Sequence, residues 1–263
     1  MCLCMTPAVK LRLFRWCDFG EMKMIDGNAV FKETAIVLPS LNPDEKFAGV
    51  VAALVEKGFE HIVIVDDGSD ESHRHFFDEA EALPQTHVIH HGVNKGKGRA
   101  LKTAISYVSE QLPQIKGVIT IDGDGQHLPD DIVKCGEKML ELGDKVVLGS
   151  RNFDQEGVPA RSVAGNKFTA RMFYVLFKIK INDTQTGLRA IPARYFKSFA
   201  EIEGERFEYE TNMLLYMKHR GIEFYEQPIA TVYDPEDYSS HYNAVKDSYK
   251  IAKIMLKYIS SGK

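Results

Sequence analysis

The sequence predicts an α/β fold in which a mostly parallel β-sheet is covered by helices on both faces. Short apolar runs of four or five residues recur from Thr34 onward, and segments with helical features separate them. The runs are apolar throughout rather than alternating, which is typical of strands buried on both faces. Polar clusters follow the runs directly, as expected where parallel strands end at one edge of a sheet.

Five strands are predicted in the first part of the chain, with four helices between them. The strand predictions rest on short, apolar runs at residues 35–38, 61–65, 87–90, 118–121 and 146–148. The helices are expected at about residues 43–57, 69–83, 98–111 and 129–143. Asn42 is a candidate cap for the first helix, with Pro43 at its first position and Gly58 at its end, and Ser69 is a candidate cap for the second.

The pattern changes after residue 151, where a C-terminal helical elaboration is expected. Helices are predicted over residues 165–180, 208–220 and 244–259, and a strand over residues 229–233. The chain shows no glycine- or serine-rich linker and no internal repeat. We therefore divide it into an N-terminal extension without an assigned role, one α/β domain and a basic amphipathic helix, at residues 1–33, 34–240 and 241–263.

Composition excludes several classes of protein. The chain has 263 residues, 44% of them hydrophobic, and a net charge of −4, which suits one soluble domain and gives no sign of a nucleic-acid partner. Four cysteines without a paired framework fit a reducing cytosol. No apolar run approaches the ~20 residues that span a bilayer. We expect a cytoplasmic protein and leave open a peripheral position on the inner face of the cell membrane.

The first chemical motif is the pair Asp122 and Asp124 in "TIDGDGQHLPDD", directly after the predicted fourth strand. Neighbouring carboxylates repel each other unless a cation lies between them. Hard oxygen ligands in a glycine-containing loop suit Mg²⁺ or Mn²⁺ with waters and a phosphate. The alternative is a solvated turn with a helix cap. His127 is a candidate for acting on a substrate or for bonding the backbone.

Two further motifs suggest a nucleotide. Asp66 and Asp67 end the predicted second strand, where a carboxylate can bond a ribose hydroxyl or a base edge, or cap the next helix. The stretch "NKGKGR", which contains Lys97, precedes a helix and suits an anion, although a solvated basic turn explains it equally well. A set of basic residues follows the fifth strand, and arginine suits forked recognition of phosphate. These residues are Arg151, Arg161, Lys167, Arg171 and Arg189.

Eight stretches, in order, resemble the family 2 glycosyltransferases with the GT-A fold, and within them the polyprenyl-phosphate sugar transferases. The matching stretches are "VLPSLN", "IVDDGSDES", "NKGKGRAL", "IDGDGQHLPDDI", "GSRNF", "RSVAGNKFT", "DTQTGLRAI" and "RFEYETNML". The resemblance covers about residues 33–240. One departure is Pro43, where the family usually has a glutamate, and it puts one nucleotide-loop contact in doubt.

The resemblance implies roles for particular residues. Those implied at the nucleotide are Pro39, Asn42, Asp66, Asp67, Lys97 and Asp122. Asp124 and Gln126 would hold Mg²⁺ or Mn²⁺. Those implied at the acceptor are Arg151, Arg161, Asn166, Gln185 and Arg189, of which Arg151 and Arg161 would hold a phosphate. The expected catalytic set is Asp122, Asp124, Arg151, Arg161 and Asp183.

The expected reaction is metal-dependent, inverting transfer of a sugar from a nucleotide sugar, UDP-linked rather than GDP-linked, to a polyprenyl phosphate. The alternative is transfer to a hydroxyl of a cell-wall or capsular glycan, with Asp183 or Glu208 as the general base. More remote are a sugar nucleotidyltransferase and a non-catalytic nucleotide-sugar-binding protein.

The predicted terminal helix has a lysine stripe and a wide apolar arc. The lysines are Lys246, Lys250, Lys253 and Lys257. Such a helix lies on an anionic membrane or packs on its own domain with the lysines in water. A lipid acceptor requires access to a membrane surface, directly or through a small membrane partner protein.

Overall fold

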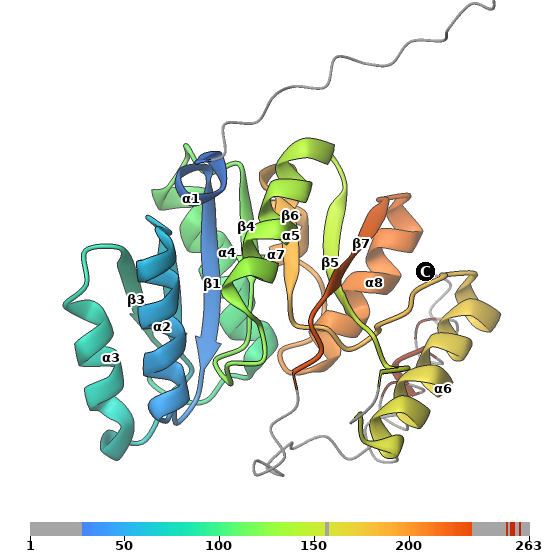
Figure 1. Cartoon of the computed structure of the whole chain (residues 1–263), viewed down its shortest axis with the longest axis horizontal. Helices are drawn as coiled ribbons and strands as arrows, with labels where there is room; N and C mark the ends of the chain where they lie inside the picture. Colours follow the sequence, from blue (N-terminus) through green and yellow to red (C-terminus); the bar gives the residue numbers. More distant parts are fainter. Residues whose placement is uncertain (1–27, 156–157, 233–250, 252, 256–257, 259–263) are drawn as a thin grey trace, which may run out of the picture.

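The computed structural model describes residues 28–155, 158–232, 251, 253–255 and 258. Seven strands form one sheet in the order β3-β2-β1-β4-β6-β5-β7 (Figure 1). The strands are β1 Thr34–Ser40, β2 Ile62–Asp66, β3 Thr86–His90, β4 Gly117–Thr120, β5 Val146–Arg151, β6 Arg189–Pro192 and β7 Phe224–Ile229. All neighbouring strands are parallel except β6, which runs antiparallel to both β4 and β5.

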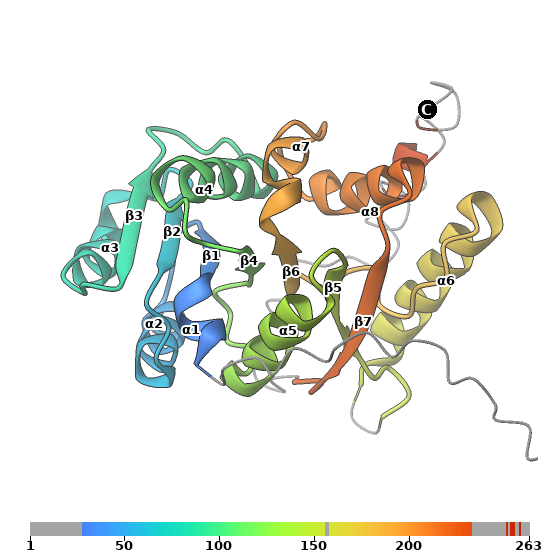
Figure 2. The same ribbon diagram turned by 90° about the horizontal axis from the view of Figure 1, so that it is seen from above.

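Helices cover both faces of the sheet (Figure 2). The view from above shows α4, α7 and α8 on one face and α1, α2 and α5 on the other, with α3 beside β3 and α6 beyond β7. The helices are α1 Ala29–Glu33, α2 Glu45–Lys57, α3 Arg74–Glu81, α4 Lys97–Gln111, α5 Pro129–Leu142, α6 Ala160–Phe177, α7 Phe196–Ala200 and α8 Glu208–Arg220, with short 3₁₀ turns η1 Glu71–His73 and η2 Ala193–Tyr195. The predicted α/β fold is confirmed.

Two hydrophobic cores explain why β1, β2 and β4 contain runs of consecutive apolar residues. Successive side chains of a strand point to opposite faces of the sheet. Val37 therefore belongs to the core that contains Leu214 of α8, while its neighbours Ile36 and Leu38 belong to the core that contains Phe47 of α2. Burying large aliphatic side chains stabilises a fold by about 1.5–3 kcal/mol each, so both layers hold the sheet in place.

Several predicted helix limits are corrected by the structure. Asp44, not Asn42, caps α2, because its carboxylate accepts a hydrogen bond from the backbone N–H of Lys46. Ser69 caps no helix; its hydroxyl accepts a hydrogen bond from the backbone N–H of Asn42, and a 3₁₀ turn precedes α3. The helix predicted over 165–180 begins earlier, at Ala160, and ends at Phe177.

The second half holds the larger differences. Strand β6 and the short helix α7 were not predicted, and the last described strand lies at 224–229 rather than 229–233. The prediction for 208–220 is confirmed at both ends. Within the described part, no helix is both long enough and apolar enough to cross a membrane. The division into 1–33, 34–240 and 241–263 stays a prediction.

The predicted terminal helix lies largely outside the described residues, including Lys246, Lys250 and Lys257. Its described positions are helical and turn apolar side chains toward the domain. Met255 is fully buried in the core on the α4 and α8 face, and the ring of Tyr258 meets that of Phe177 edge-on at 5.9 Å. Lys253 is exposed. The described part therefore follows the packing alternative.

Candidate active site

The predicted site residues gather at one edge of the sheet, the lower edge in Figure 1. The carboxyl ends of β1, β2, β4 and β5 lie there because these strands run in the same direction. Strand β6 runs in the opposite direction, so the loop that precedes it, residues 183–188, reaches the same edge. This edge has a half built from β1, β2 and β4 and a half built from β5 and the 183–188 loop.

A charged cluster lies where β4 ends. Lys97, the first residue of α4, places its Nζ 2.7 Å from Oδ1 of Asp122 and 3.2 Å from Oε1 of Glu210. Phe207 lies 5.9 Å from the same ammonium group. The other side of the Asp122 carboxylate rests against Gly187, where an added Cβ would come within 2.3 Å of Oδ2. The carboxylate is thus fixed by a cation on one side and by backbone on the other.

Electrostatics keeps this cluster charged. Burial alone would raise the pKa of Asp122, but the cations Lys97 and Arg151 outweigh it and hold that pKa well below its usual range. Burial would likewise lower the pKa of Lys97, and the carboxylates of Asp122 and Glu210 reverse the direction and raise it. At neutral pH both members of the pair are ionised.

Asp124 differs from Asp122 in its surroundings. Its side chain is exposed, and Oδ1 accepts a hydrogen bond of 3.0 Å from the backbone N–H of Gln126. In the described part of the chain, no group of three or more His, Cys, Asp or Glu side chains is arranged to hold a metal. One exposed carboxylate and a neighbouring amide instead suit a Mg²⁺-like ion that takes its other ligands from substrate phosphates and water.

His127 supports the loop between the two aspartates. Its Nδ1 lies 3.2 Å from the backbone nitrogen of Asp122 and accepts that N–H, which requires a neutral ring with its proton on Nε2. Burial lowers the pKa of His127, in keeping with the neutral form. Its observed contact is the backbone alternative of the two considered from the sequence.

At the end of β2, Asp66 and Asp67 have different partners. Oδ1 of Asp67 accepts hydrogen bonds from His91 Nδ1 and from the backbone N–H of Lys95, and Oδ2 accepts from the N–H of Gly96. Asp67 is 3% exposed and holds the 91–96 loop through these hydrogen bonds, and its contact with a nucleotide stays a prediction. Asp66 bonds the backbone N–H of Ser69 and the ring of His90.

The amide of Asn42 ties the loop after β1 to the loop after β2. Its Oδ1 accepts from the backbone N–H of Asp70 at 2.8 Å, and its Nδ2 donates to the Asp70 carboxylate at 3.1 Å. Pro39 lies within β1, paired with Val65 of β2, and is half-buried. The structure therefore brings together the loops predicted to meet the nucleotide.

The carboxylates of Glu81 and Asp66 lie on either side of the His90 imidazole, each at 2.8 Å. Burial would lower the pKa of His90, but the two carboxylates raise it; burial would raise the pKa of Asp66, but hydrogen bonds from His90 and Ser69 lower it. The stabilisation from Asp66 is present above pH 3.8 and is lost as the pH falls through its folded pKa. The stabilisation from His90 is present below pH 6.5 and is lost as the pH rises through its folded pKa.

We therefore expect His90→Gln to lower the free energy of unfolding more at about pH 5.5 than at about pH 9. The difference should stay below about 1 kcal/mol, because the imidazole is 35% exposed and solvent screens the pairs. Urea unfolding at the two pH values measures it, and the exposed His219→Gln variant is the matched control. An effect of His90→Gln that is equal at both pH values would contradict the ionic account.

On the other half of the edge, Arg151 and Asp183 form a two-pronged ion pair. The guanidinium Nε lies 2.7 Å from Oδ2 of Asp183, and a terminal nitrogen lies 3.2 Å from Oδ1. Asp183 is fully buried and also accepts the backbone N–H of Gln185. Phe153 lies 5.3 Å from the guanidinium carbon. The predicted residues Arg151, Asp183 and Gln185 are therefore brought together, with Asp183 directed at the arginine.

Two residues predicted at the acceptor are buried and form hydrogen bonds to the loop before β6. Asn166 of α6 is 3% exposed, donates to the carbonyl of Asn182 and accepts from the backbone N–H of Thr184. Arg189 is 1% exposed and donates to the carbonyls of Thr186 and Glu210. These side chains hold the 182–189 loop, and their contact with an acceptor stays a prediction. Arg161 lies in the first turn of α6, and its side chain is outside the described part.

The sequence analysis did not name two acidic residues that the structure places at the site. Glu210 lies two residues past Glu208 in the "RFEYETNML" stretch, and its place in that stretch was the available signal. Glu226 of β7 accepts hydrogen bonds from the backbone N–H of Asn182 at 2.8 Å and from the hydroxyl of Ser150 at 3.2 Å. A single acid on a misplaced strand gave no signal for that contact.

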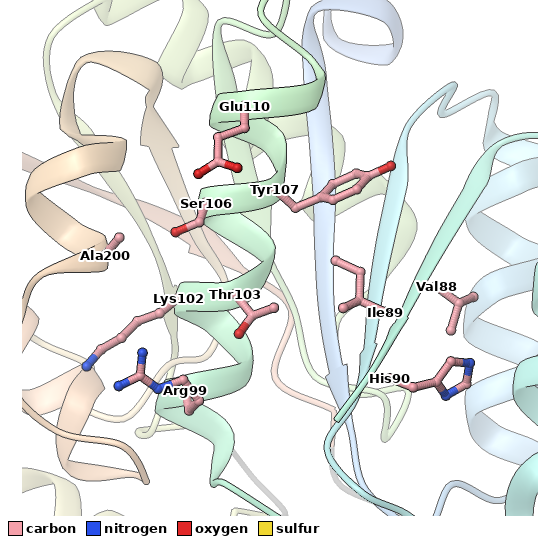
Figure 3. A pocket seen from close by; sticks show the side chains of 10 residues that line it. All are labelled: Val88, Ile89, His90, Arg99, Lys102, Thr103, Ser106, Tyr107, Glu110 and Ala200. Carbon is pink, nitrogen blue, oxygen red and sulfur yellow. The ribbon is translucent and has the colours of Figure 1, made fainter. Parts of the chain in front are cut away.

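Two cavities accompany the sheet. One, of about 390 Å³, adjoins Asp124 and Gln126 and extends between α2 and α5. The other, of about 640 Å³, is a shallow depression along α4 and β3, shown in Figure 3 with Lys102, Tyr107 and Val88 around it. Of the residues predicted at the site, Asp124 and Gln126 line the smaller cavity, and none lines the larger one.

A mostly parallel α/β sheet with helices on both faces is the architecture of the GT-A fold. The family model "Glycosyl transferase family 2" matches residues 35–199, more than half of the chain. The chain belongs to this family.

Curated relatives cover most of the chain. It is 28% identical over 215 residues to the UDP-N-acetylglucosamine–dolichyl-phosphate N-acetylglucosaminyltransferase of Methanococcus voltae, covering 75% of this chain and 85% of the relative. It is 27% identical over 214 residues to the glycosyltransferase AglJ of Haloferax volcanii, covering 81% and 67%. The resemblance to dolichyl-phosphate sugar transferases is confirmed.

Solved structures share the fold. Mannosyl-3-phosphoglycerate synthase of Rubrobacter xylanophilus superimposes with a TM-score of 0.65 at 15% identity, covering 87% of this chain and 74% of that one. Glucosyl-3-phosphoglycerate synthase of Mycobacterium tuberculosis, crystallised with Mn²⁺, UDP and its product, gives 0.61 at 14% identity, covering 88% and 81%. At sequence identities of 15% and 14%, these similarities show a shared fold and not a shared substrate.

Proposed function

We propose that the chain is a metal-dependent, inverting glycosyltransferase that moves a sugar from a UDP-linked donor to a polyprenyl phosphate at a membrane surface. We call the half built from β1, β2 and β4 the donor half, and the half built from β5 and the 183–188 loop the acceptor half. The observation that carries the proposal is that the carboxylates able to serve as a base for the acceptor are already bound to other groups. A hydroxyl acceptor needs a carboxylate able to take its proton. A lipid phosphate is already ionised and needs cations and positioning instead.

The candidate bases are all engaged by other groups. Asp183 is fully buried against Arg151, and Glu208 accepts the backbone N–H groups of residues 205 and 206. Glu210 is paired with Lys97. Taking up a proton at any of these carboxylates would remove its charge and so weaken the charge-assisted hydrogen bonds it accepts, which are stronger than neutral ones. This arrangement supports a phosphate acceptor over a glycan hydroxyl.

The donor half suits a nucleoside diphosphate. Asp124 and Gln126 would hold Mg²⁺ or Mn²⁺, which would neutralise the charge of the leaving diphosphate. Asp122, held by Lys97 and Gly187, is placed to orient the donor, and Asp66 and Asn42 lie on the loops toward its nucleoside. The relative from Methanococcus voltae, named for a UDP-linked donor and a dolichyl-phosphate acceptor, supports the same donor and acceptor classes.

The acceptor half provides positive charge near the sugar. Arg151 stacks on Phe153 and is fixed by Asp183, so its position is set before a phosphate arrives. The planar guanidinium of arginine can donate hydrogen bonds to two oxygens of one phosphate, which also fixes the direction from which the phosphate approaches. An oxygen of the lipid phosphate would attack the anomeric carbon while the UDP oxygen leaves from the opposite side, which inverts the configuration.

The test compares two acceptors that differ only in the phosphate. Purified protein is given Mn²⁺, a single nucleotide sugar and either polyprenyl phosphate or the corresponding polyprenol in detergent, and released nucleotide is measured. UDP-glucose, UDP-N-acetylglucosamine, UDP-galactose and GDP-mannose are tried separately. We expect release from a UDP-sugar with polyprenyl phosphate alone. Release with polyprenol, or with a glycan in place of the lipid, would overturn the phosphate acceptor and favour the hydroxyl alternative.

A further inference from the structure

Helix α6 exposes an apolar surface at the outer end of the molecule. It lies beyond β7 in both ribbon views (Figures 1 and 2). Phe168 is 53% exposed, Tyr174 56% and Val175 54%. Phe168 and Val175 are two helical turns apart and therefore share one face. Isolated exposed apolar residues are ordinary, but a contiguous group on one helix marks an interaction surface.

The opposite face of α6 is already used by the fold. Phe173 and Thr169 are 1% exposed, and Asn166 holds the 182–184 loop. Burial with the period of a helix fixes the rotation of α6, so Phe168, Tyr174 and Val175 cannot turn inward without exposing Phe173. Their exposure is therefore a property of the folded helix.

The charges of this helix are of one sign. Between residues 160 and 180 the charged residues are basic, namely Arg161, Lys167, Arg171, Lys178 and Lys180. Lys167 pairs with Asp154 just before the helix, while Arg171 and Lys178 lie on the exposed side among the apolar residues. The whole chain has a net charge of −4, so this basic stretch is a local concentration.

We propose that the exposed face of α6 lies on an anionic lipid membrane, with Phe168, Tyr174 and Val175 in the interfacial layer and Arg171 and Lys178 against the lipid headgroups. An amphipathic helix with aromatic side chains and a basic flank binds such an interface by apolar burial and by attraction to anionic lipid. A protein partner would need acidic side chains placed among apolar ones to match this face. An anionic bilayer presents both negative headgroups and an apolar layer across its whole surface.

This inference rests on the proposed function, because the proposed acceptor, a polyprenyl phosphate, resides in a membrane. Asn166 on the inner face of α6 holds the loop that carries Asp183, so a membrane beneath α6 would lie close to the acceptor half. It also moves the membrane contact from the terminal helix, whose described residues pack on the domain, to α6.

The test is sedimentation of the full chain with vesicles of phosphatidylcholine and phosphatidylglycerol, and with vesicles of phosphatidylcholine alone. The wild type should bind the mixed vesicles, and binding should fall as salt is raised. The Arg171→Gln, Lys178→Gln double variant should bind about 25-fold more weakly, at about fivefold for each cation removed. A Phe168→Ser, Val175→Ser double variant should lose about tenfold or more, because its apolar burial is gone.

Matched controls lie elsewhere on the surface. Lys218→Gln with Arg220→Gln removes the same charge from α8, and Tyr225→Ser removes an exposed aromatic ring beside Lys138. Both should bind mixed vesicles as the wild type does. All changed side chains are exposed, so melting temperatures should agree and show that each variant is folded.

Three outcomes would overturn the inference: wild type that stays in solution with every vesicle, α6 variants that bind like the wild type, or control variants that lose as much binding as the α6 variants. If the α6 face instead joins two copies, light scattering will show a dimer that Phe168→Ser, Val175→Ser converts to a monomer, and vesicle binding will be absent. Transfer to polyprenyl phosphate in detergent is scored separately, so failure of vesicle binding is distinguishable from failure of the proposed reaction.

Discussion

An Asp124→Asn variant is expected to lose about a thousandfold or more of its sugar-transfer rate. A divalent ion contributes several kcal/mol to stabilising a leaving diphosphate, and each 1.4 kcal/mol corresponds to about tenfold in rate. Asparagine keeps the oxygen that accepts the backbone N–H of Gln126, so the turn should remain folded while one anionic ligand is removed. Steady-state rates across a Mn²⁺ titration measure the loss, and the Mn²⁺ requirement should shift to higher concentrations.

The matched control is Asp130→Asn, which changes an exposed aspartate of α5 paired with Lys57 at 2.5 Å. Its rate should stay within about twofold of the wild type, since exposed ion pairs contribute little. If Asp124→Asn keeps more than a tenth of the rate with an unchanged Mn²⁺ requirement, Asp124 does not hold the ion.

The second large effect is expected from Gly187→Ala. A Cβ at this position would lie 2.3 Å from Oδ2 and 2.9 Å from Cγ of Asp122, so the carboxylate must move. Moving it breaks or lengthens the 2.7 Å contact with Lys97. A displacement of about 1 Å in a positioning group costs on the order of a hundredfold in rate. We expect that loss in kcat/KM for the nucleotide sugar, together with weaker UDP binding by calorimetry.

Gly92→Ala is the control, because an added Cβ there meets no atom within 4 Å. It should leave both kcat/KM and UDP binding near the wild-type values. Wild-type kinetics in Gly187→Ala would show that Asp122 needs no fixed position. A large fall in melting temperature would instead point to damage to the loop as a whole, so the melting temperature is measured alongside.

The first half of the fold could be predicted from the sequence because its signals are local. Strands β1, β2, β4 and β5 each contain a short apolar run, and Gly58 ends α2 in the left-handed conformation that glycine favours. Strand β6, "RAIP", carries an arginine and a proline, so it does not read as a buried strand. It is a strand because its backbone pairs with β4 and β5, which are distant in the chain, and Arg189 is accommodated by hydrogen bonds to the carbonyls of Thr186 and Glu210.

The site was predicted by residue type more reliably than by role. Asp122 and Asp124 were expected as a pair, and their difference comes from neighbours the sequence does not place: Lys97 beside one and solvent beside the other. From the sequence, the stretch "NKGKGR" suited an anion or a solvated basic turn. In the structure, a Cβ at Gly98 would come within 2.6 Å of Tyr209, so this glycine allows α4 and α8 to approach each other.

The reversed direction of β6 has a consequence for how this architecture can vary. The chain leaves the sheet at Arg151 and re-enters it at Arg189, and these two points are held side by side by the pairing of Leu148 with Arg189. Everything between them, including α6, is a closed excursion whose two ends are clamped together. Such an excursion can be lengthened, shortened or exchanged between relatives while the remaining strands keep their register. Gly187 lies within this excursion and rests against Asp122, so any variation that preserves the position of Asp122 must also preserve this contact.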